Sequence, residues 1–158
     1  MTANDIKTYV LGGKSNFTVE STKVDKRFTF LVTKDKNNNS RYMCGVMCGS
    51  DNTKDYRFLG WFYKDEMELR TSTALTDIRY KFLKEFLQLV HSNNIPPACK
   101  FYPSGKCARC GRKLTTPESI ERGFGPGCYE EVVEQRLTER NEKLRKLEDI
   151  ADQIGVTK

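Results

Sequence analysis

Histidine is almost missing from this chain: His91 is the only one among 158 residues. The sequence also lacks a phosphate-cradling glycine loop and a Ser-x-Gly elbow, so no constellation for general acid–base or nucleophilic catalysis is evident. No apolar run approaches the roughly eighteen residues that a membrane-spanning helix needs. These absences favour a protein that is not an enzyme and not a membrane protein, and we expect it in the cytoplasm.

Net charge and cysteine content further restrict the kind of protein and the partner to be expected. The formal net charge is +6, and 37% of the residues are hydrophobic, which is low but adequate for a mixed fold. The six cysteines include a group with metal-ligand spacing, so we interpret them as reduced thiols rather than disulfides. The excess of basic residues favours a polyanionic partner.

The pattern of the first hundred residues predicts an antiparallel sheet covered by one helix. Residues 1–15 are polar and are expected to precede the fold. Alternation of apolar and polar residues then predicts strands over 16–20, 26–34, 40–49, 56–63 and 67–70. Helical spacing from Ile78 to Val90 predicts a helix over 76–92, with Thr76 as its N-cap, followed by a linker over 96–105.

A long helical pattern occupies the C-terminal end. Its apolar residues follow a heptad spacing that Arg140 interrupts, over Val133, Leu137, Leu144, Leu147, Ala151 and Ile154. Such a stripe packs either on its own domain or on another chain, so a homodimer through this helix is one expectation. We predict an α+β fold with three parts: 1–98, the sheet and helix; 99–128, a zinc finger; and 129–158, the C-terminal helix.

Cysteine spacing predicts the zinc finger. Cys107 and Cys110 are followed at once by Gly111, a turn in which two thiolates converge on one cation. Cys128 follows Gly-Pro-Gly at the start of the long helix, where proline is tolerated. A knuckle, a hairpin and a ligand in the first turn of a helix outline a treble-clef-like finger around one structural Zn²⁺.

A structural zinc site needs four ligands, and this run supplies three cysteines. Cys99, eight residues before the knuckle, is our first choice for the fourth. His91 and Glu131 are alternatives, and a water molecule in the fourth position would leave room for catalysis.

The segment CARCGRKLTTPESIERGFGPGC resembles a small zinc-finger domain of unknown function that occurs mostly in bacteriophage and plasmid-borne proteins. The matching residues are Cys107, Cys110, Gly111, Arg112, Leu114, Thr115, Pro117, Glu118, Ser119, Ile120, Arg122, Gly123, Gly125, Pro126 and Cys128. The resemblance covers about a seventh of the chain. It implies a bound metal and a mobile-element origin, and it implies no activity.

Positive charge is concentrated on the finger. Residues 100–113 contain five basic side chains and no acid. We predict a nucleic-acid-binding surface of DNA or RNA type formed by Lys100, Lys106, Arg109, Arg112, Lys113 and Arg122. Five aromatic residues of the predicted strands are further candidates, for base stacking: Tyr42, Tyr56, Phe58, Trp61 and Tyr63. Aromatic residues in such positions more often belong to the hydrophobic core. Strict alternation allows at most half of them on an open face.

Two other functions remain open. The first is a protein-binding module that inhibits or recruits a host protein, which the long seamed helix and the resemblance to mobile-element proteins favour. The second is a metal-dependent enzyme with an open zinc position or a carboxylate pair, drawn from Asp51, Asp55, Asp65, Glu66 and Glu68. We also expect Cys44 and Cys48 to be core thiols on one face of a strand.

Overall fold

A computed structural model describes residues 1–49, 54–73 and 75–155. The chain forms two compact units, Met1–Gly125 and Pro126–Lys158, each of which is described by itself. Unit 1 contains a six-stranded antiparallel sheet with helices, and unit 2 is one long helix. The predicted α+β class is therefore confirmed.

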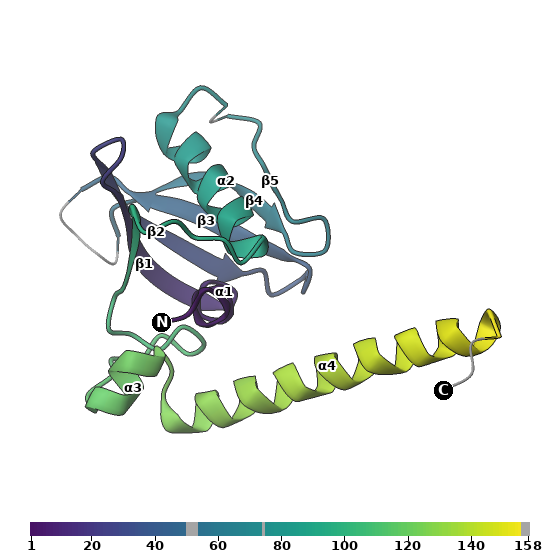
Figure 1. The fold of residues 1–158 in the computed structure, drawn as a ribbon. Helices are drawn as coiled ribbons and strands as arrows, with labels where there is room; N and C mark the ends of the chain where they lie inside the picture. The colour runs from purple at the N-terminus through teal and green to yellow at the C-terminus, as the bar shows by residue number, and fades with distance from the viewer. Residues whose placement is uncertain (50–53, 74, 156–158) are drawn as a thin grey trace. The chain divides into compact units, whose positions relative to one another are not determined.

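The sheet has the strand order β5-β4-β3-β2-β1-β6 (Figure 1). Its first five strands are β1 (Lys14–Ser21), β2 (Lys26–Lys34), β3 (Arg41–Met47), β4 (Tyr56–Tyr63) and β5 (Glu68–Arg70). They form a meander because each one pairs with its neighbour in the sequence, as the alternating patterns predict.

The sixth strand occupies the segment that we predicted as a linker. β6 (Cys99–Pro103) pairs antiparallel with β1, so that Phe101 lies opposite Val19. A five-residue strand with one large apolar residue gives little alternation to detect in sequence. The centroid of the Phe101 ring lies 5.2 Å from that of Phe17, and this contact fixes the segment on the sheet.

A helix also forms where we predicted a polar lead-in. α1 (Ala3–Val10) begins with a capping box, in which the Thr2 hydroxyl accepts from the Asp5 N–H and the Asp5 carboxylate accepts from the Thr2 N–H. Its Tyr9 and Val10 side chains are fully buried. The helix has only two turns, which is too short for a clear periodic signal.

The main helix, α2 (Ile78–His91), lies within the predicted range, but its N-cap is Asp77 rather than Thr76. Phenylalanine rings connect it to the sheet: Phe86 lies 5.9 Å from Phe17, and Phe82 lies 6.2 Å from Phe30. The core of unit 1 is therefore an aromatic layer between α2 and one face of the sheet.

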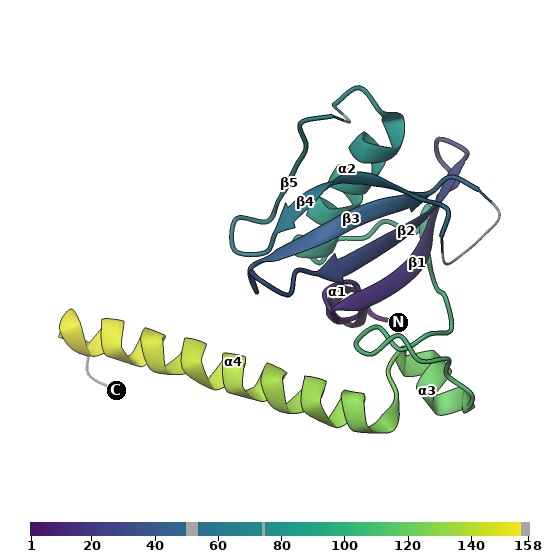
Figure 2. The ribbon, with the colours of Figure 1, turned by 180° about the vertical axis from the view of Figure 1, so that it is seen from behind.

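The opposite face of this sheet carries no helix of unit 1 (Figure 2). A β-bulge between Cys44 and Gly45 shifts the register of β4, so that Leu59 and Phe62 both point into the core. The bulge turns Phe58 and Trp61 to the same open face, although strict alternation would place them on opposite faces. Of the five aromatic candidates, Tyr42 is buried and the other four lie on the open face.

The two sheet cysteines differ. Cys44 is fully buried, as predicted, whereas Cys48 is exposed because β3 ends at Met47. The expectation that both thiols are core residues is wrong for Cys48.

Unit 2 is α4 (Pro126–Gln153), a helix of 28 residues. Large apolar side chains along it and just after its end are more than half exposed: Leu137, Leu144, Leu147, Ile150 and Ile154. None of the described helices combines the length and the apolar character that crossing a bilayer requires.

Candidate metal centre and basic finger

The knuckle, residues 107–111, is closed by backbone hydrogen bonds. The Gly111 N–H donates to the Cys107 carbonyl at 2.9 Å, and the Cys107 N–H donates to the Arg112 carbonyl at 2.8 Å. Gly111 has φ of 80°, in the left-handed region that glycine adopts without steric cost. The glycine after the second cysteine therefore lets the chain reverse directly behind the two thiols.

Three sulfur atoms meet at this turn. Those of Cys107, Cys110 and Cys128 all lie within 4.8 Å of one another. Tetrahedral zinc with Zn–S bonds of about 2.3 Å separates its sulfur ligands by about 3.8 Å. The three thiols can therefore hold a metal ion after a small contraction.

Hydrogen-bond donors surround the Cys107 sulfur. Burial raises the pKa of this thiol, but the backbone N–H groups of Cys110, Gly125 and Arg109 and the Cys110 side chain outweigh it and lower the pKa to about 7. In the sheet, where burial dominates, the pKa of the Cys44 thiol is raised to about 12. A metal ion binds the thiolate form of cysteine. The lowered pKa therefore favours metal binding at Cys107, whereas the raised pKa disfavours it at Cys44.

The structure places Cys99 outside this sulfur group. Cys99 is the first residue of β6 and lies opposite Ser21, whereas the knuckle follows the last residue, Pro103. Four residue steps of extended strand lead from Cys99 to Pro103 and span about 13 Å. The expectation that Cys99 completes the site assumed a flexible linker, and β6 removes that freedom.

The other candidate ligands also lie outside the group. His91 is exposed at the last position of α2, and Glu131 is exposed on α4. Among the residues that the structure describes, no histidine or carboxylate joins the three cysteines. Of the carboxylates considered for a nuclease centre, Asp51 lies outside the described residues, and no metal-type group contains Asp55, Asp65, Glu66 or Glu68.

The finger packs on α1 and on the start of β1. The Lys14 N–H donates to the Ala108 carbonyl, and the Ala108 N–H donates to the Gly123 carbonyl at 2.9 Å. The Tyr9 ring lies edge-on to Phe124, with 6.1 Å between centroids. Any side chain at Gly123 would overlap that tyrosine, because a Cβ there would lie 2.3 Å from Tyr9 Cδ2. The glycine therefore permits the close approach of finger and helix.

A short helix stands where a hairpin is expected between the knuckle and α4. α3 (Pro117–Arg122) has Thr116 as N-cap, proline in its first turn and Gly123 in the left-handed conformation as C-cap. These are ordinary helix boundary signals, and they are visible in the sequence. The only pairing of hairpin type among the described residues of the finger is an isolated bridge between Lys106 and Lys113.

Four of the predicted basic residues lie in or beside this turn: Lys106, Arg109, Arg112 and Lys113. Arg122 ends α3, and Lys100 lies on β6 opposite Glu20, away from the turn. Lys100, Arg112 and Lys113 are exposed, and Lys106, Arg109 and Arg122 are half-buried. The bridge sets Lys106 directly opposite Lys113, a like-charge pairing that destabilises a strand pair unless an anion neutralises it. Sequence reasoning missed Lys14, whose side chain lies 3.6 Å from the position of a Cβ on Gly111.

Comparison with known proteins gives one match. A family of unknown function, DUF6011, matches residues 100–133, about a fifth of the chain. No curated protein and no solved structure matches the chain. The matched range contains the three clustered cysteines and the basic turn, together with most of β6 and the start of α4, and it leaves out the other five strands of the sheet.

Proposed function

We propose that Cys107, Cys110 and Cys128 hold a structural zinc ion, and that the basic turn around it binds nucleic acid. Three convergent sulfur ligands and the donors around Cys107 support zinc over the harder cations, which prefer oxygen ligands. When bound, zinc would fix the knuckle and the first turn of α4, and it supplies no chemistry of its own in this proposal.

The opposed lysines Lys106 and Lys113 are the observation that carries the nucleic-acid proposal. Arg112 on the same turn and Lys14 beside it add charge, and residues 100–113 contain no acid. A phosphate backbone would neutralise this cluster and release counterions, so binding would weaken steeply as salt rises. A small accessory protein of a mobile element is a role consistent with this activity.

Charge substitution tests the proposal. The finger variant carries glutamine at the four turn positions, Lys106, Arg109, Arg112 and Lys113. A control variant carries glutamine at four exposed lysines elsewhere, at Lys23, Lys36, Lys81 and Lys84. Both variants lose the same charge. We expect the finger variant to lose most of its affinity for labelled oligonucleotides and to show a shallower salt dependence, by about 0.7–0.9 in slope for each phosphate that is no longer neutralised.

Equal behaviour of the two variants would contradict a role of the finger. The protein-binding alternative would be favoured by two results together: a pull-down in which the wild type retains a host protein after nuclease treatment, and no binding of oligonucleotides by the wild type. Zinc is quantified on each sample, because a variant that loses its metal no longer tests the charge.

We also propose that α4 pairs with a second copy of the chain. Four of its five exposed apolar side chains follow the heptad a and d positions, with Leu137 and Leu144 at a and Leu147 and Ile154 at d, and Ile150 falls at g. Glutamates at 134 and 148 then fall at e, and Arg136 and Lys143 fall at g. A parallel pair sets the g lysine of one copy opposite the e glutamate of the other, whereas an antiparallel pair sets like charges together.

Light scattering after size exclusion tests this pairing. The wild type is expected to reach twice the monomer mass as concentration rises, and Leu144→Glu is expected to stay a monomer. Glu142→Gln, which changes a polar position outside the a and d seam, is the control and is expected to dimerise like the wild type. A monomer at all concentrations in the wild type would contradict the proposal.

A further inference from the structure

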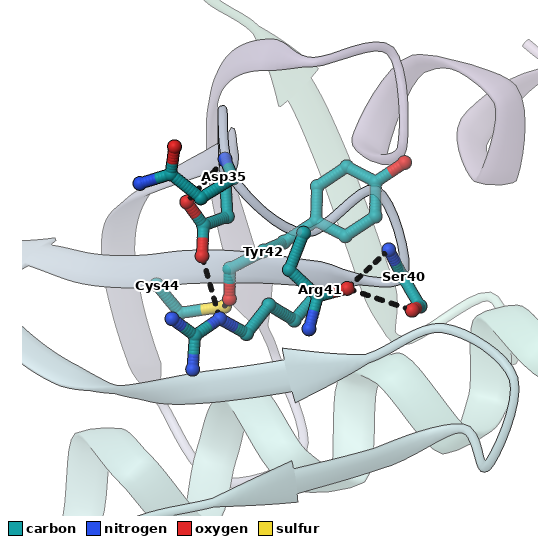
Figure 3. Close-up of polar contacts among 7 residues, drawn as sticks. Asp35, Ser40, Arg41, Tyr42 and Cys44 are labelled. Atoms are coloured by element: carbon teal, nitrogen blue, oxygen red, sulfur yellow. Dashed lines mark hydrogen bonds and ion pairs between the residues drawn. The ribbon is translucent and has the colours of Figure 1, made fainter.

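Three arginine–aromatic pairs lie on the open face of the sheet. The Arg41 guanidinium lies 4.0 Å from the centroid of Trp61, and Arg70 lies 4.6 Å from that of Tyr63. Arg27 lies over Tyr102 at 5.7 Å, on the other side of the same face. The guanidinium of Arg41 is held by Asp35, whose carboxylate accepts a hydrogen bond from its Nε at 2.6 Å (Figure 3). Flat cationic and aromatic groups are therefore fixed in place along the face.

Apolar side chains on the same face are accessible. Phe58 is 42% exposed and lies edge-on to Trp61 with 5.8 Å between centroids. Met43, which pairs with Trp61 across the strands, is 37% exposed. Exposing apolar side chains of this size to water costs free energy, so a partner that covers them is favoured by the apolar area it buries.

The other half of the open face is polar. Thr18 and Thr29 share a hydrogen bond of 2.7 Å between their hydroxyls, and the Asn16 side chain donates to the Tyr56 hydroxyl. An apolar protein surface would cover these polar side chains without offering hydrogen bonds in place of those they make with water. Aromatic rings, guanidinium groups and polar side chains on one surface are the combination that unstacked bases and their backbone use.

Lys14 joins this face to the finger. It is the first residue of β1, and the pairing register sets it in one row across the sheet with Thr33, Met43, Trp61 and Arg70. Its backbone bonds to Ala108 of the knuckle. The row from β1 to β4 covers three strand spacings, or about 14 Å. A chain of phosphates bound at the knuckle can therefore continue over the aromatic rings.

We propose that the open sheet face is a stacking platform for single-stranded nucleic acid, with Phe58 and Trp61 at its centre. This inference rests on the proposed function and adds to it the strandedness of the ligand. A duplex keeps its bases stacked inside, so it can use the basic finger and not the rings. Single strands use both, the finger for phosphate and the face for bases.

Trp61 is the only tryptophan of the chain, so its fluorescence reports on this face. The full-length zinc-loaded protein is titrated with a dodecamer of thymidine, a dodecamer of uridine and a DNA duplex of the same length. We expect both single strands to quench Trp61 in a saturable and salt-sensitive way, and the duplex to bind without quenching. The difference between the thymidine and uridine curves separates DNA from RNA.

Substitutions at Phe58 test stacking separately from folding. Phe58→Ala is expected to weaken single-strand binding about 5- to 150-fold and to leave duplex binding unchanged, because it removes the stacking of one base on a ring. Phe58→Tyr keeps a ring and is expected to retain affinity, whereas Phe58→Leu keeps apolar volume and is expected to lose it. Ile78→Ala, at an exposed residue of α2, is the matched control for the loss of surface apolar area.

The outcomes separate this inference from the function on which it rests. Single-strand binding that leaves Trp61 unquenched and is insensitive to Phe58→Ala, but is lost in the finger variant, overturns the platform and leaves the finger intact. Quenching that persists in the finger variant overturns the finger and supports the platform. The platform is also overturned if Phe58→Ala binds single strands as tightly as the wild type does and binds the duplex equally well. No binding by the wild type overturns both.

Discussion

The sheet of unit 1 and its finger are stabilised by different means. In the sheet, phenylalanine side chains form a continuous buried layer with α2, including Phe17, Phe30, Phe86 and Phe101. Between Cys107 and Gly125 the buried large apolar side chains are only Leu114 and Phe124, and the second of these packs on α1. The sheet can fold through the hydrophobic effect, whereas the finger has little buried apolar area, which is why we propose that it depends on a metal held by its three cysteines.

The largest effect is expected from removal of the proposed zinc ion. Structural zinc contributes about 10–16 kcal/mol of apparent binding free energy in isolated fingers, and this segment has little else to hold it. A strong chelator, or Cys110→Ser, is expected to abolish zinc binding and to remove hydrogen-exchange protection from the knuckle and α3, while the amides of the strands stay protected. Cys48→Ser, at an exposed thiol outside the group, is the matched control.

Loss of protection across the strands on chelation would contradict the separation of the two regions. Full protection of the knuckle without metal would show that α1 and β1 hold the finger by packing alone.

Next in size is a cavity in the aromatic layer. Phe30 is fully buried and packs on the rings of Phe17 and Phe82. Phe30→Ala is expected to lower the free energy of unfolding of unit 1 by about 3–5 kcal/mol, measured by urea titration of the strand signal. At low denaturant the zinc content is expected to stay at the wild-type level, and a fall in zinc before the sheet unfolds would argue against this view.

A substitution at the contact between finger and α1 sharpens the comparison. Gly123→Ala places a Cβ against Tyr9 and also strains a φ of 80°. We expect a loss of about 2–4 kcal/mol, with both the finger and α1 losing protection. Gly105→Ala isolates the backbone contribution, because φ is 83° there and no atom lies within 4 Å of the new Cβ. Equal losses in the two variants would mean that the packing against Tyr9 contributes nothing.

The smallest effect concerns pH, and it belongs to the sheet and α2 alone. A hydrogen bond from the Arg79 side chain lowers the pKa of Asp77, the N-cap of α2, from 3.8 to about 2. Because the folded pKa is the lower one, the carboxylate stabilises the fold above pH 4, and this contribution is lost as pH falls from about 4 to about 2.

We expect about 1–2 kcal/mol of stability to be lost over that interval. Asp77→Asn keeps a cap and is expected to flatten this part of the profile, measured by thermal unfolding at several pH values. A profile identical to that of the wild type would refute the assignment to Asp77.

The sequence predicts those features that have long or repeated patterns. Alternation over 26–34 and helical spacing over 78–90 give β2 and α2, and the Cys-x-x-Cys-Gly run gives the knuckle. It fails where an element is short or is fixed by contacts distant in sequence. β6 forms because Phe101 packs on Phe17, and this strand holds Cys99 outside the group of three sulfur atoms.

The open face is a third kind of case. Its aromatic character comes from the bulge opposite Gly45, where one extra residue in β4 turns Trp61 to the same face as Phe58. Strict alternation of strand residues does not predict such a bulge. The division of the chain into 1–98, 99–128 and 129–158 stays a prediction, and so do nucleic-acid binding and the absence of catalysis.

The most direct test is the affinity for a single-stranded oligonucleotide measured on one sample three times: as purified with zinc, after chelation, and after zinc is returned. If a metal-held finger presents the basic turn, affinity falls by at least an order of magnitude on chelation and returns with zinc, while the circular dichroism of the strands is unchanged. Affinity that is the same in all three states would contradict the central claim, because the basic turn would then bind without the metal that is proposed to form it.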